Sequence, residues 1–221
     1  IEQLKENKLI DYAEPNYIFS VNDFTIDSDI IYDKDLKPVN EDDLAPLTPN
    51  DPLYSDQSNI TDANIDDVWG EYTTGDGSQI VAILDTGVDY THPDLVDNIW
   101  ENIAERDGIA GFDDDGNGYV DDIYGWDFIN ADNTPLDDNM HGTHVAGIVG
   151  AVGGNGKGIA GAAWNVKLMS IKVFQSNGTG NSTTIAEGVT YSAINGATIL
   201  NMSFGSYGES HTLKSALENA Y

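Results

Sequence analysis

The order of apolar and polar positions predicts a parallel α/β fold for the greater part of the chain. Short apolar runs bounded by turn or polar residues are typical of strands buried on both faces, and they cover residues 79–84, 167–174 and 197–204. Two helix-length stretches lie among them: residues 142–152, which are rich in small side chains, and residues 182–195, with apolar positions at helical spacing. Strands that alternate with helices through right-handed crossovers imply a parallel sheet with helices on both faces.

The first fifty residues have a different pattern of apolar and polar positions. A helix end is expected over residues 1–7, followed by an alternating strand over residues 9–19. Beyond that strand, Asp, Asn and Pro are mixed with scattered apolar residues without periodicity, which is typical of a linker. The pattern divides the chain into an N-terminal piece (1–20), a linker or processing region (21–49) and an α/β domain (50–221).

The charge of the chain excludes several classes of partner. Acidic residues outnumber basic ones by 38 to 9, and the formal net charge is -29. Nucleic acid and anionic membrane surfaces both need a Lys/Arg face that this chain cannot supply, whereas bound cations are favoured. No apolar run approaches the roughly 20 residues of a membrane span. The chain has no cysteine, which excludes disulfides and thiolate chemistry.

Polar residues at strand ends are the first candidates for chemistry, because open parallel sheets place their sites beyond the carboxyl ends of strands. Asp85 ends the first apolar run, and residues 203–205 end the third. A strand-end aspartate is either a turn or cap residue or an anion that orients an imidazole. His141 and His144 open the small-residue helix, but they lack the spacing of four and the glutamate of a zinc helix. We expect the first imidazole to reach a cleft and His144 to be a buried core residue.

Several blocks of residues, taken in order, carry a family resemblance. Residues 80–89, 92–95 and 141–147 resemble the aspartate and histidine blocks of subtilisin-like serine peptidases, and residues 201–205 resemble the substrate-binding strand of that family. The resemblance covers residues 50–221, and within the family the sequence is most similar to thermitase-type bacterial enzymes. It implies a serine endopeptidase that acts on protein or peptide substrates through an Asp-His-Ser triad.

The resemblance also assigns roles to individual residues. It implies that Asp85 is the triad acid and His141 the general base. The nucleophilic serine and the oxyanion-hole asparagine belong to later blocks that these 221 residues do not contain. Ser203 matches the substrate-binding strand, so it is not a replacement nucleophile. Because the chain also opens on Ile1 without a signal peptide, we expect a fragment that is truncated before the catalytic serine and inactive alone.

A substrate is expected to dock as an extended strand between two backbone edges. The resemblance assigns one edge to Gly178, Thr179 and Gly180 and the other to Ser203, Phe204 and Gly205. Glycine suits such edges, because a Cβ would obstruct the approach of a peptide backbone. The alternative for residues 177–182 is a flexible loop.

The distribution of acidic residues makes Ca²⁺ the expected cofactor. Ten aspartates and no lysine or arginine lie between residues 107 and 138, a density that requires separation, protonation or a cation. Oxygen ligands with intervening Gly and Asn suit calcium. The resemblance implies a first site in the loop after the histidine helix, with two remote carboxylates. Its ligands would be the side chains of Asp51, Asp94 and Asn155 and the carbonyls of Val152, Lys157 and Ile159.

Two further calcium sites are weaker candidates. The second, thermitase-like, retains Asp127, Asp132 and Thr134, but Asn130 and Leu136 stand where the relatives have other ligands, so we expect weaker binding. The third resembles the first half of an EF-hand loop, with Asp113, Asp115, Asn117 and Asp121. Tyr124 replaces the bidentate glutamate of that loop, and a solvated acidic turn is the alternative.

The N-terminal piece resembles, over residues 9–19, the last strand of the inhibitory propeptide of many subtilisin-like enzymes. The resemblance implies a secreted, extracellular and monomeric protease that its own propeptide inhibits, with cleavage somewhere in residues 21–50. A non-catalytic calcium-binding or adhesion module would explain the negative charge. It would not explain why the residues around Asp85 and His141 match the two family motifs. A pseudoprotease that has lost its serine would explain both.

Overall fold

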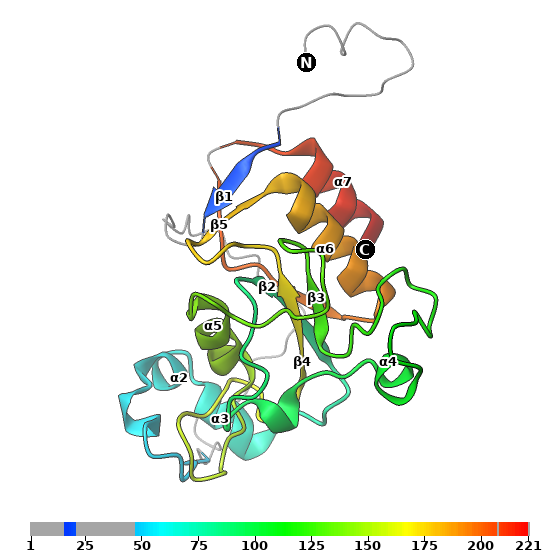
Figure 1. The fold of residues 1–221 in the computed structure, drawn as a ribbon. Coiled ribbons are helices and arrows are strands. Elements are labelled where there is room, and N and C mark those ends of the chain that lie inside the picture. The colour runs from blue at the N-terminus through cyan, green and yellow to red at the C-terminus, as the bar shows by residue number, and fades with distance from the viewer. Residues whose placement is uncertain (1–15, 21–46, 207, 221) are drawn as a thin grey trace, which may run out of the picture.

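A parallel sheet forms the centre of the molecule. The computed structural model describes residues 16–20, 47–206 and 208–220 (Figure 1). The sheet has the order β3-β4-β2-β6 and contains β2 (Ile80–Asp85), β3 (Gly125–Asp127), β4 (Lys167–Lys172) and β6 (Ile199–Asn201). All three strand pairs are parallel. The expected helix end over residues 1–7 and most of the expected strand and linker lie outside the described residues.

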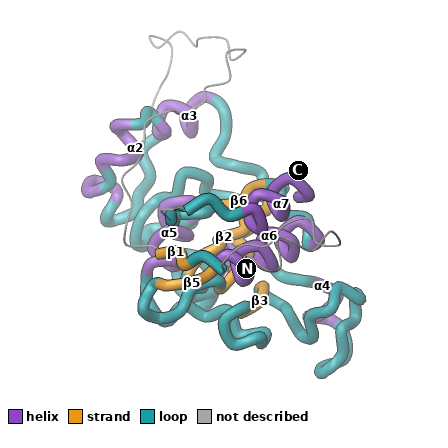
Figure 2. Tube along the Cα trace, turned by 90° about the horizontal axis from the view of Figure 1, so that it is seen from above, coloured by secondary structure: helices purple, strands orange, loops and turns teal. Residues whose placement is uncertain are grey.

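Successive side chains of β2, one of the two inner strands, face two different helices. Ala82 and Leu84 pack in the cluster that includes Ile185 of α6 (Ser182–Ile194). Val81 and Ile83 pack on the opposite face with Val145 of α5 (His141–Gly150). α7 (His211–Ala220) lies beside α6, away from α5 (Figures 1 and 2). The predicted α/β class, a parallel sheet with helices on both faces, is confirmed.

A small second sheet lies above one end of the main one. β1 (Ile18–Ser20) pairs antiparallel with β5 (Thr179–Asn181), which directly precedes α6 (Figure 1). On its other side, Ser20 forms an antiparallel bridge with Gly205, with N···O distances of 3.2 and 3.3 Å. β6 is shorter than the apolar run over residues 197–204 predicts, because the chain leaves the sheet after Asn201 and pairs with β1 instead.

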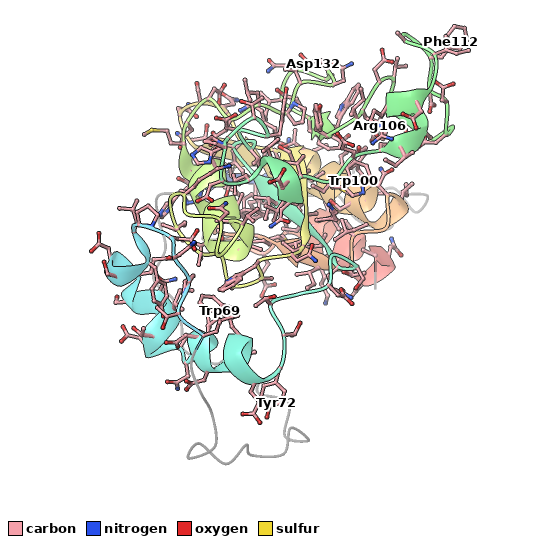
Figure 3. All side chains as sticks on the ribbon, turned by 90° about the horizontal axis from the view of Figure 1, so that it is seen from below. Trp69, Tyr72, Trp100, Arg106, Phe112 and Asp132 are labelled. Atoms are coloured by element: carbon pink, nitrogen blue, oxygen red, sulfur yellow. The ribbon has the colours of Figure 1, made fainter. Side chains whose placement is uncertain are left out.

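A small hydrophobic cluster, the satellite cluster, contains Ile60, Trp69 and Ala160. It includes residues from a region, 54–71, where the sequence pattern predicts no helix or strand. That region contains the short elements η2 (Tyr54–Asp56), α2 (Ser58–Asp62) and α3 (Ile65–Glu71). Trp69 of α3, labelled in Figure 3, packs against Trp164 with ring centroids 4.9 Å apart. η2 buries no residue, and α2 and α3 bury one apolar residue each, Ile60 and Trp69, so these elements leave little periodicity in the sequence.

Beyond the satellite cluster lie η3 (Val96–Asn98) and α4 (Ile103–Asp107). α4 opens an acidic excursion, residues 103–122, and Phe112 stands at its outer end (Figure 3). No helix in the described residues is long and apolar enough to cross a membrane.

Candidate active site and cation-binding loops

The structure brings together a carboxylate and an imidazole that are 56 residues apart in the chain. His141 Nδ1 lies 2.8 Å from Asp85 Oδ1 and 2.9 Å from Asp85 Oδ2. Asp85 is fully buried at the end of β2, and its Oδ1 also accepts the backbone N–H of Thr86. Burial raises the pKa of Asp85, and the hydrogen bonds from His141 and Thr86 offset part of that rise. The His141 ring is 28% exposed, so it can meet a substrate.

Close approach of α5 to the end of β2 depends on glycine at position 142. A Cβ on Gly142 would lie 2.1 Å from the carbonyl oxygen of Gly87 and 3.0 Å from Asp85 Cβ. The N–H of Gly142 donates to Thr86 Oγ1. The residue before the histidine, Met140, has a φ of 86°, in the left-handed region that non-glycine residues rarely adopt. The start of α5 is therefore fixed on both sides of His141.

Asp137 is a site residue that sequence reasoning missed. Its Oδ1 accepts the Thr86 hydroxyl at 2.8 Å, and its Oδ2 accepts the N–H and the hydroxyl of Thr143 in the first turn of α5. Burial acts to raise the pKa of Asp137, but hydrogen bonds from Thr143, Asn139 and Thr86 together hold it below its ordinary value. An acidic residue five positions before the predicted helix start at residue 142 was the available signal.

His144 differs from its predicted role. It is exposed, not buried in the core. Met140, His144 and Ile148 recur at intervals of four, and all three are exposed on one side of α5. The small residues of this helix face the sheet, so the helix is half-buried and not buried all round. His144 also lines an open groove of about 500 Å³ beside Leu95 and Ile159.

The two predicted substrate edges face each other across a strand of the same chain. Phe19 pairs with Gly180 and Ser20 bridges Gly205, so residues 18–20 lie between the two edges. Phe19 is 6% exposed and contacts the Phe204 ring edge-on, with centroids 5.9 Å apart. Thr179, next to Gly180, pairs with Ser20. The expected cleft therefore has room for an extended peptide with a buried aromatic side chain.

Two glycines of the first predicted edge also meet requirements within the chain itself. Gly178 has a φ of 77° in the turn before β5, which a residue with a Cβ rarely adopts. A Cβ on Gly180 would lie 2.5 Å from the carbonyl oxygen of Val173, so this glycine admits a neighbouring part of the chain. The hydroxyl of Ser203 donates to Asn201 Oδ1, which directs it away from the role of a nucleophile.

The first candidate cation site assembles from remote segments. Gly154 N–H donates to Asp51 Oδ2, and the Asn155 amide donates to Asp94 Oδ1. Ile159 N–H donates to Asp94 Oδ2, and the Val152 N–H to the carbonyl of Asp94. Asn155 Oδ1 accepts the N–H of Lys157.

This arrangement fits a cation. Asp51 and Asp94 are 5% and 3% exposed, and the buried Asp51 Oδ1 has no hydrogen-bond partner within the part of the chain that the structure describes. An unpaired buried carboxylate oxygen is costly, and a cation would satisfy it. The carbonyl-rich loop 152–159 supplies the hard oxygen donors that calcium prefers.

The second candidate site satisfies its own polar atoms. Asp127 pairs through its backbone with Asp132, and its buried carboxylate accepts the N–H groups of Ile129 and Asn130 and the Asn130 amide. The Thr134 N–H donates to Asp132 Oδ1. The three predicted residues lie together in one turn, but no oxygen there requires a metal.

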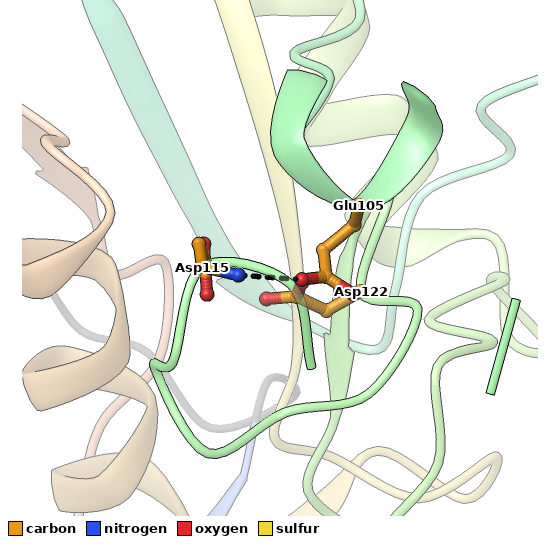
Figure 4. Close-up of side chains that lie close together, drawn as sticks. All are labelled: Glu105, Asp115 and Asp122. Carbon is orange, nitrogen blue, oxygen red and sulfur yellow. Dashed lines mark hydrogen bonds between the residues drawn. The ribbon is translucent and has the colours of Figure 1, made fainter. Parts of the chain in front are cut away.

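The third candidate site converges on a different set of residues from the predicted one. The carboxylates of Glu105, Asp115 and Asp122 offer ligand oxygens that all lie within 4.8 Å of one another (Figure 4). Asp113 turns into its own loop and accepts the N–H groups of Gly116, Asn117 and Gly118. Asp121 accepts the N–H of Gly111.

Of the four predicted residues, only Asp115 contributes a carboxylate to this group, while Asn117 donates its amide to Asp115 and Asp122. Asp122 is fully buried, and desolvation raises its pKa to about 6. Glu105 and Asp122 were missed because the EF-hand pattern looks only at alternate positions of one loop, and Glu105 belongs to α4.

Comparisons with known proteins agree with this geometry. The model of the Subtilase family, Peptidase_S8, matches residues 76–221. A thermophilic serine proteinase of Bacillus sp. (strain AK1) is 34% identical over 221 residues, which are 100% of this chain and 43% of that protein. Thermitase of Thermoactinomyces vulgaris is 34% identical over 175 residues, 79% of this chain and 54% of the relative.

Among solved structures, sphericase superposes with a TM-score of 0.50 at 32% identity and covers 67% of this chain and 44% of its own. The chain thus spans about half the length of these relatives.

Proposed function

The chain belongs to the subtilase family, and on this premise we propose that it forms the N-terminal part of a serine endopeptidase domain that hydrolyses peptide bonds of proteins. The observation that carries the proposal is the contact between Asp85 and His141, in which a buried carboxylate lies against one ring nitrogen of a histidine whose side chain is 28% exposed. The comparisons with serine proteinases support the same reaction class.

In the proposed reaction, a serine hydroxyl from outside these 221 residues attacks the peptide carbonyl. His141 takes the hydroxyl proton at Nε2 and later gives it to the leaving amine. Asp85, bound at Nδ1, fixes the tautomer of the ring and stabilises the imidazolium. Water then releases the acyl group from the serine. Since two of the three triad members are present here, the 221-residue chain alone is proposed to be inactive.

The N-terminal segment is proposed to act as an intramolecular inhibitor. Residues 18–20 lie between the two edges that would hold a substrate, and they pair with both. An extended peptide in this position excludes a substrate strand. We assign residues 1–20 to the end of a propeptide, 21–49 to a processing region and 50–221 to the peptidase domain. Such a precursor suits a secreted, monomeric protease.

Calcium is the proposed cofactor, and the first loop is its strongest site. Asp51, Asp94 and Asn155 would hold the ion together with the carbonyls of Val152, Lys157 and Ile159. The ion would neutralise the buried carboxylates and fix the loop after α5. The Glu105, Asp115 and Asp122 cluster is a second proposed position, and the Asp127, Asp132 and Thr134 turn a weaker third.

The proposal is tested by expressing the complete coding sequence that contains this chain. We expect hydrolysis of casein and of peptide nitroanilides, complete inhibition by a serine-directed fluorophosphonate, and no hydrolysis by the 221-residue chain. A complete protein that folds, binds calcium and hydrolyses nothing would be a pseudoprotease. Because the Asp85–His141 pair would then lack a nucleophile, that outcome would overturn the enzymatic assignment.

A further inference from the structure

Lys172 is a buried cation that the proposed triad does not include. It is the last residue of β4, its side chain is 2% exposed, and it pairs in register with Asp85 at the end of β2. Leu168 of β4 packs in the α5 cluster, and side chains alternate along a strand, so Lys172 points to the same face of the sheet as α5. A charged group in this position requires its own explanation.

Every proton of the Lys172 ammonium group has an acceptor. Nζ lies 2.6 Å from the carbonyl oxygen of Thr86, 2.6 Å from Asp138 Oδ1 and 3.1 Å from the carbonyl oxygen of Phe174. An ammonium group has three protons to donate, so these contacts use its full capacity. Lys172 therefore donates to neither Asp85 nor His141.

The acceptors belong to the segments that carry the Asp85–His141 pair. Thr86 follows Asp85, donates its N–H to the Asp85 carboxylate at 2.7 Å and accepts the N–H of Gly142. Asp138 lies three residues before His141, on the loop that leads into α5. One ammonium group thus joins the strand end that carries the acid to the loop that carries the base.

Packing does not account for a lysine at this position. Removing an ammonium group from water is costly, and its charged partner Asp138 is 51% exposed, which screens the attraction between them. An apolar side chain of similar length would fill the same space without that cost. What it could not do is donate to the carbonyl oxygens of Thr86 and Phe174 and to Asp138 together.

We propose that Lys172 is a positioning residue that sets the contact between Asp85 and His141 by holding the Thr86 peptide and the Asp138 loop at fixed separation. This inference rests on the proposed function, since the contact that it adjusts is that of the general base. Lys172 acts through the two segments and touches no reacting atom.

The test measures the hydrogen bond itself in the full 221-residue chain by NMR, so it needs no hydrolysis. The chain has four histidines, and ring-¹⁵N labelling assigns the Nδ1 proton of His141, which the Asp85 contact moves to low field. The variants are Lys172→Met, Lys172→Arg and Asp138→Ala. Lys167→Met is the matched control, because Lys167 opens the same strand and, among the described residues, its Nζ donates to the carbonyl of Asp97 alone, at 3.4 Å.

We expect Lys172→Met to raise the solvent-exchange rate of the His141 proton about tenfold, the factor associated with one ordinary hydrogen bond. Asp138→Ala should raise it less, Lys172→Arg should restore most of the protection, and Lys167→Met should leave it unchanged. An equal rate in folded Lys172→Met and the unmutated chain would overturn the proposal, as would equal increases in Lys172→Met and Lys167→Met.

If Lys172→Met does not fold, the exchange rate in Asp138→Ala tests the proposal instead. The Asp138 side chain is half exposed, so its removal should be tolerated, and it leaves the Lys172 ammonium group in place. An unchanged exchange rate in that variant would overturn the proposal, and a raised rate would support it. Failure of the proposed function is a separate result, since it would appear as absence of peptide hydrolysis by the complete protein while the His141 proton remained measurable.

Discussion

Asp85 and Asp122 are both fully buried carboxylates with raised pKa values, but they have different partners. Asp85 faces the His141 ring, which can itself take up a proton. Asp122 faces the amides of Asn102 and Asn117 and the hydroxyl of Tyr191, which are neutral donors. Burial sets the cost of ionisation in both places, and the partner decides how that cost is met.

The comparison teaches what each buried acid is suited to do. A carboxylate beside a titratable ring can stabilise a charge that appears and disappears during a reaction. A carboxylate among neutral donors gains most from a permanent cation or from a proton of its own. The end of β2 is therefore suited to proton transfer, and the acidic excursion to cation binding.

The largest expected effect separates the two acids by activity. In the complete peptidase, Asp85→Asn should lower kcat about 10⁴-fold, because the asparagine no longer fixes the tautomer of His141 or stabilises its charged form. Asp122→Asn should leave kcat unchanged at saturating calcium. Steady-state hydrolysis of a peptide nitroanilide measures both. Equal losses of kcat in the two variants would contradict this difference between Asp85 and Asp122.

The next effect concerns the strand that occupies the cleft. Phe19→Ala should release β1, because truncating a buried phenylalanine costs about 3 kcal/mol or more, equivalent to roughly a hundredfold loss of protection. Hydrogen exchange of the Gly205 N–H, which bonds to the Ser20 carbonyl, reports this directly. Ile18→Ala is the matched variant, since Ile18 is 66% exposed and should leave exchange unchanged. Similar exchange in both variants would mean that the aromatic contacts do not hold β1.

Calcium should stabilise the folded chain through Asp51. At a concentration one hundred times Kd, binding adds about 2.7 kcal/mol, which is about 5–10 °C in Tm for a domain of this size. Asp51→Asn should lose most of that gain because it removes the unpaired buried oxygen. Thermal melts with calcium and with chelator measure the difference. Asp132→Asn, which changes an exposed carboxylate of the Asp127, Asp132 and Thr134 turn, should keep most of the gain, and the reverse order would reassign the main site.

The last expected effect is the pH dependence that Asp122 gives to the free energy of unfolding. The unfolded chain titrates this carboxyl near pH 4, whereas the folded chain holds the proton up to about pH 6. Between these values the folded state binds more protons, so the contribution of this group falls as the pH rises from 4 to 6 and stays lost above 6, by at most about 3 kcal/mol.

Urea unfolding in chelator should show this component in the unmutated chain and not in Asp122→Asn. Calcium should also remove it, because the cation favours the ionised form. Asp115→Asn gives the comparison with an exposed acid of the same cluster. A pH profile identical in Asp122→Asn and the unmutated chain would contradict the raised pKa of Asp122.

Strands β2, β4 and β6 of the main sheet and helices α5 and α6 could be predicted from the sequence, because apolar runs and helical periodicity report burial, whereas the three-residue strand β3 was missed because it is too short to form an apolar run. The positions of Asp85 and His141 were also readable, since one ends an apolar run and the other opens a helix. His144 was misplaced because small residues suggest a helix buried all round, whereas only one side of α5 meets the sheet.

Contacts between remote segments could not be read from local patterns. Glu105 joins Asp115 and Asp122 only because α4 folds back over the acidic loop. Lys172 meets Asp138 only because β4 ends beside the loop before α5. The environment of the Asp51 carboxylate likewise depends on a loop about 100 residues away. Gly154 of that loop donates its N–H to Oδ2, while Oδ1 has no partner among the described residues.

α6 gives the two sites a common support. Its 13 residues extend about 20 Å. At its first residue, the hydroxyl of Ser182 holds Asn16 and Tyr17 beside the cleft, and in its last turn Tyr191 donates to Asp122. A chain whose acidic loop has not yet folded leaves the far end of this helix without its polar partner. One helix thus contacts, at its opposite ends, the segment that lies between the cleft edges and the buried acid of the acidic excursion.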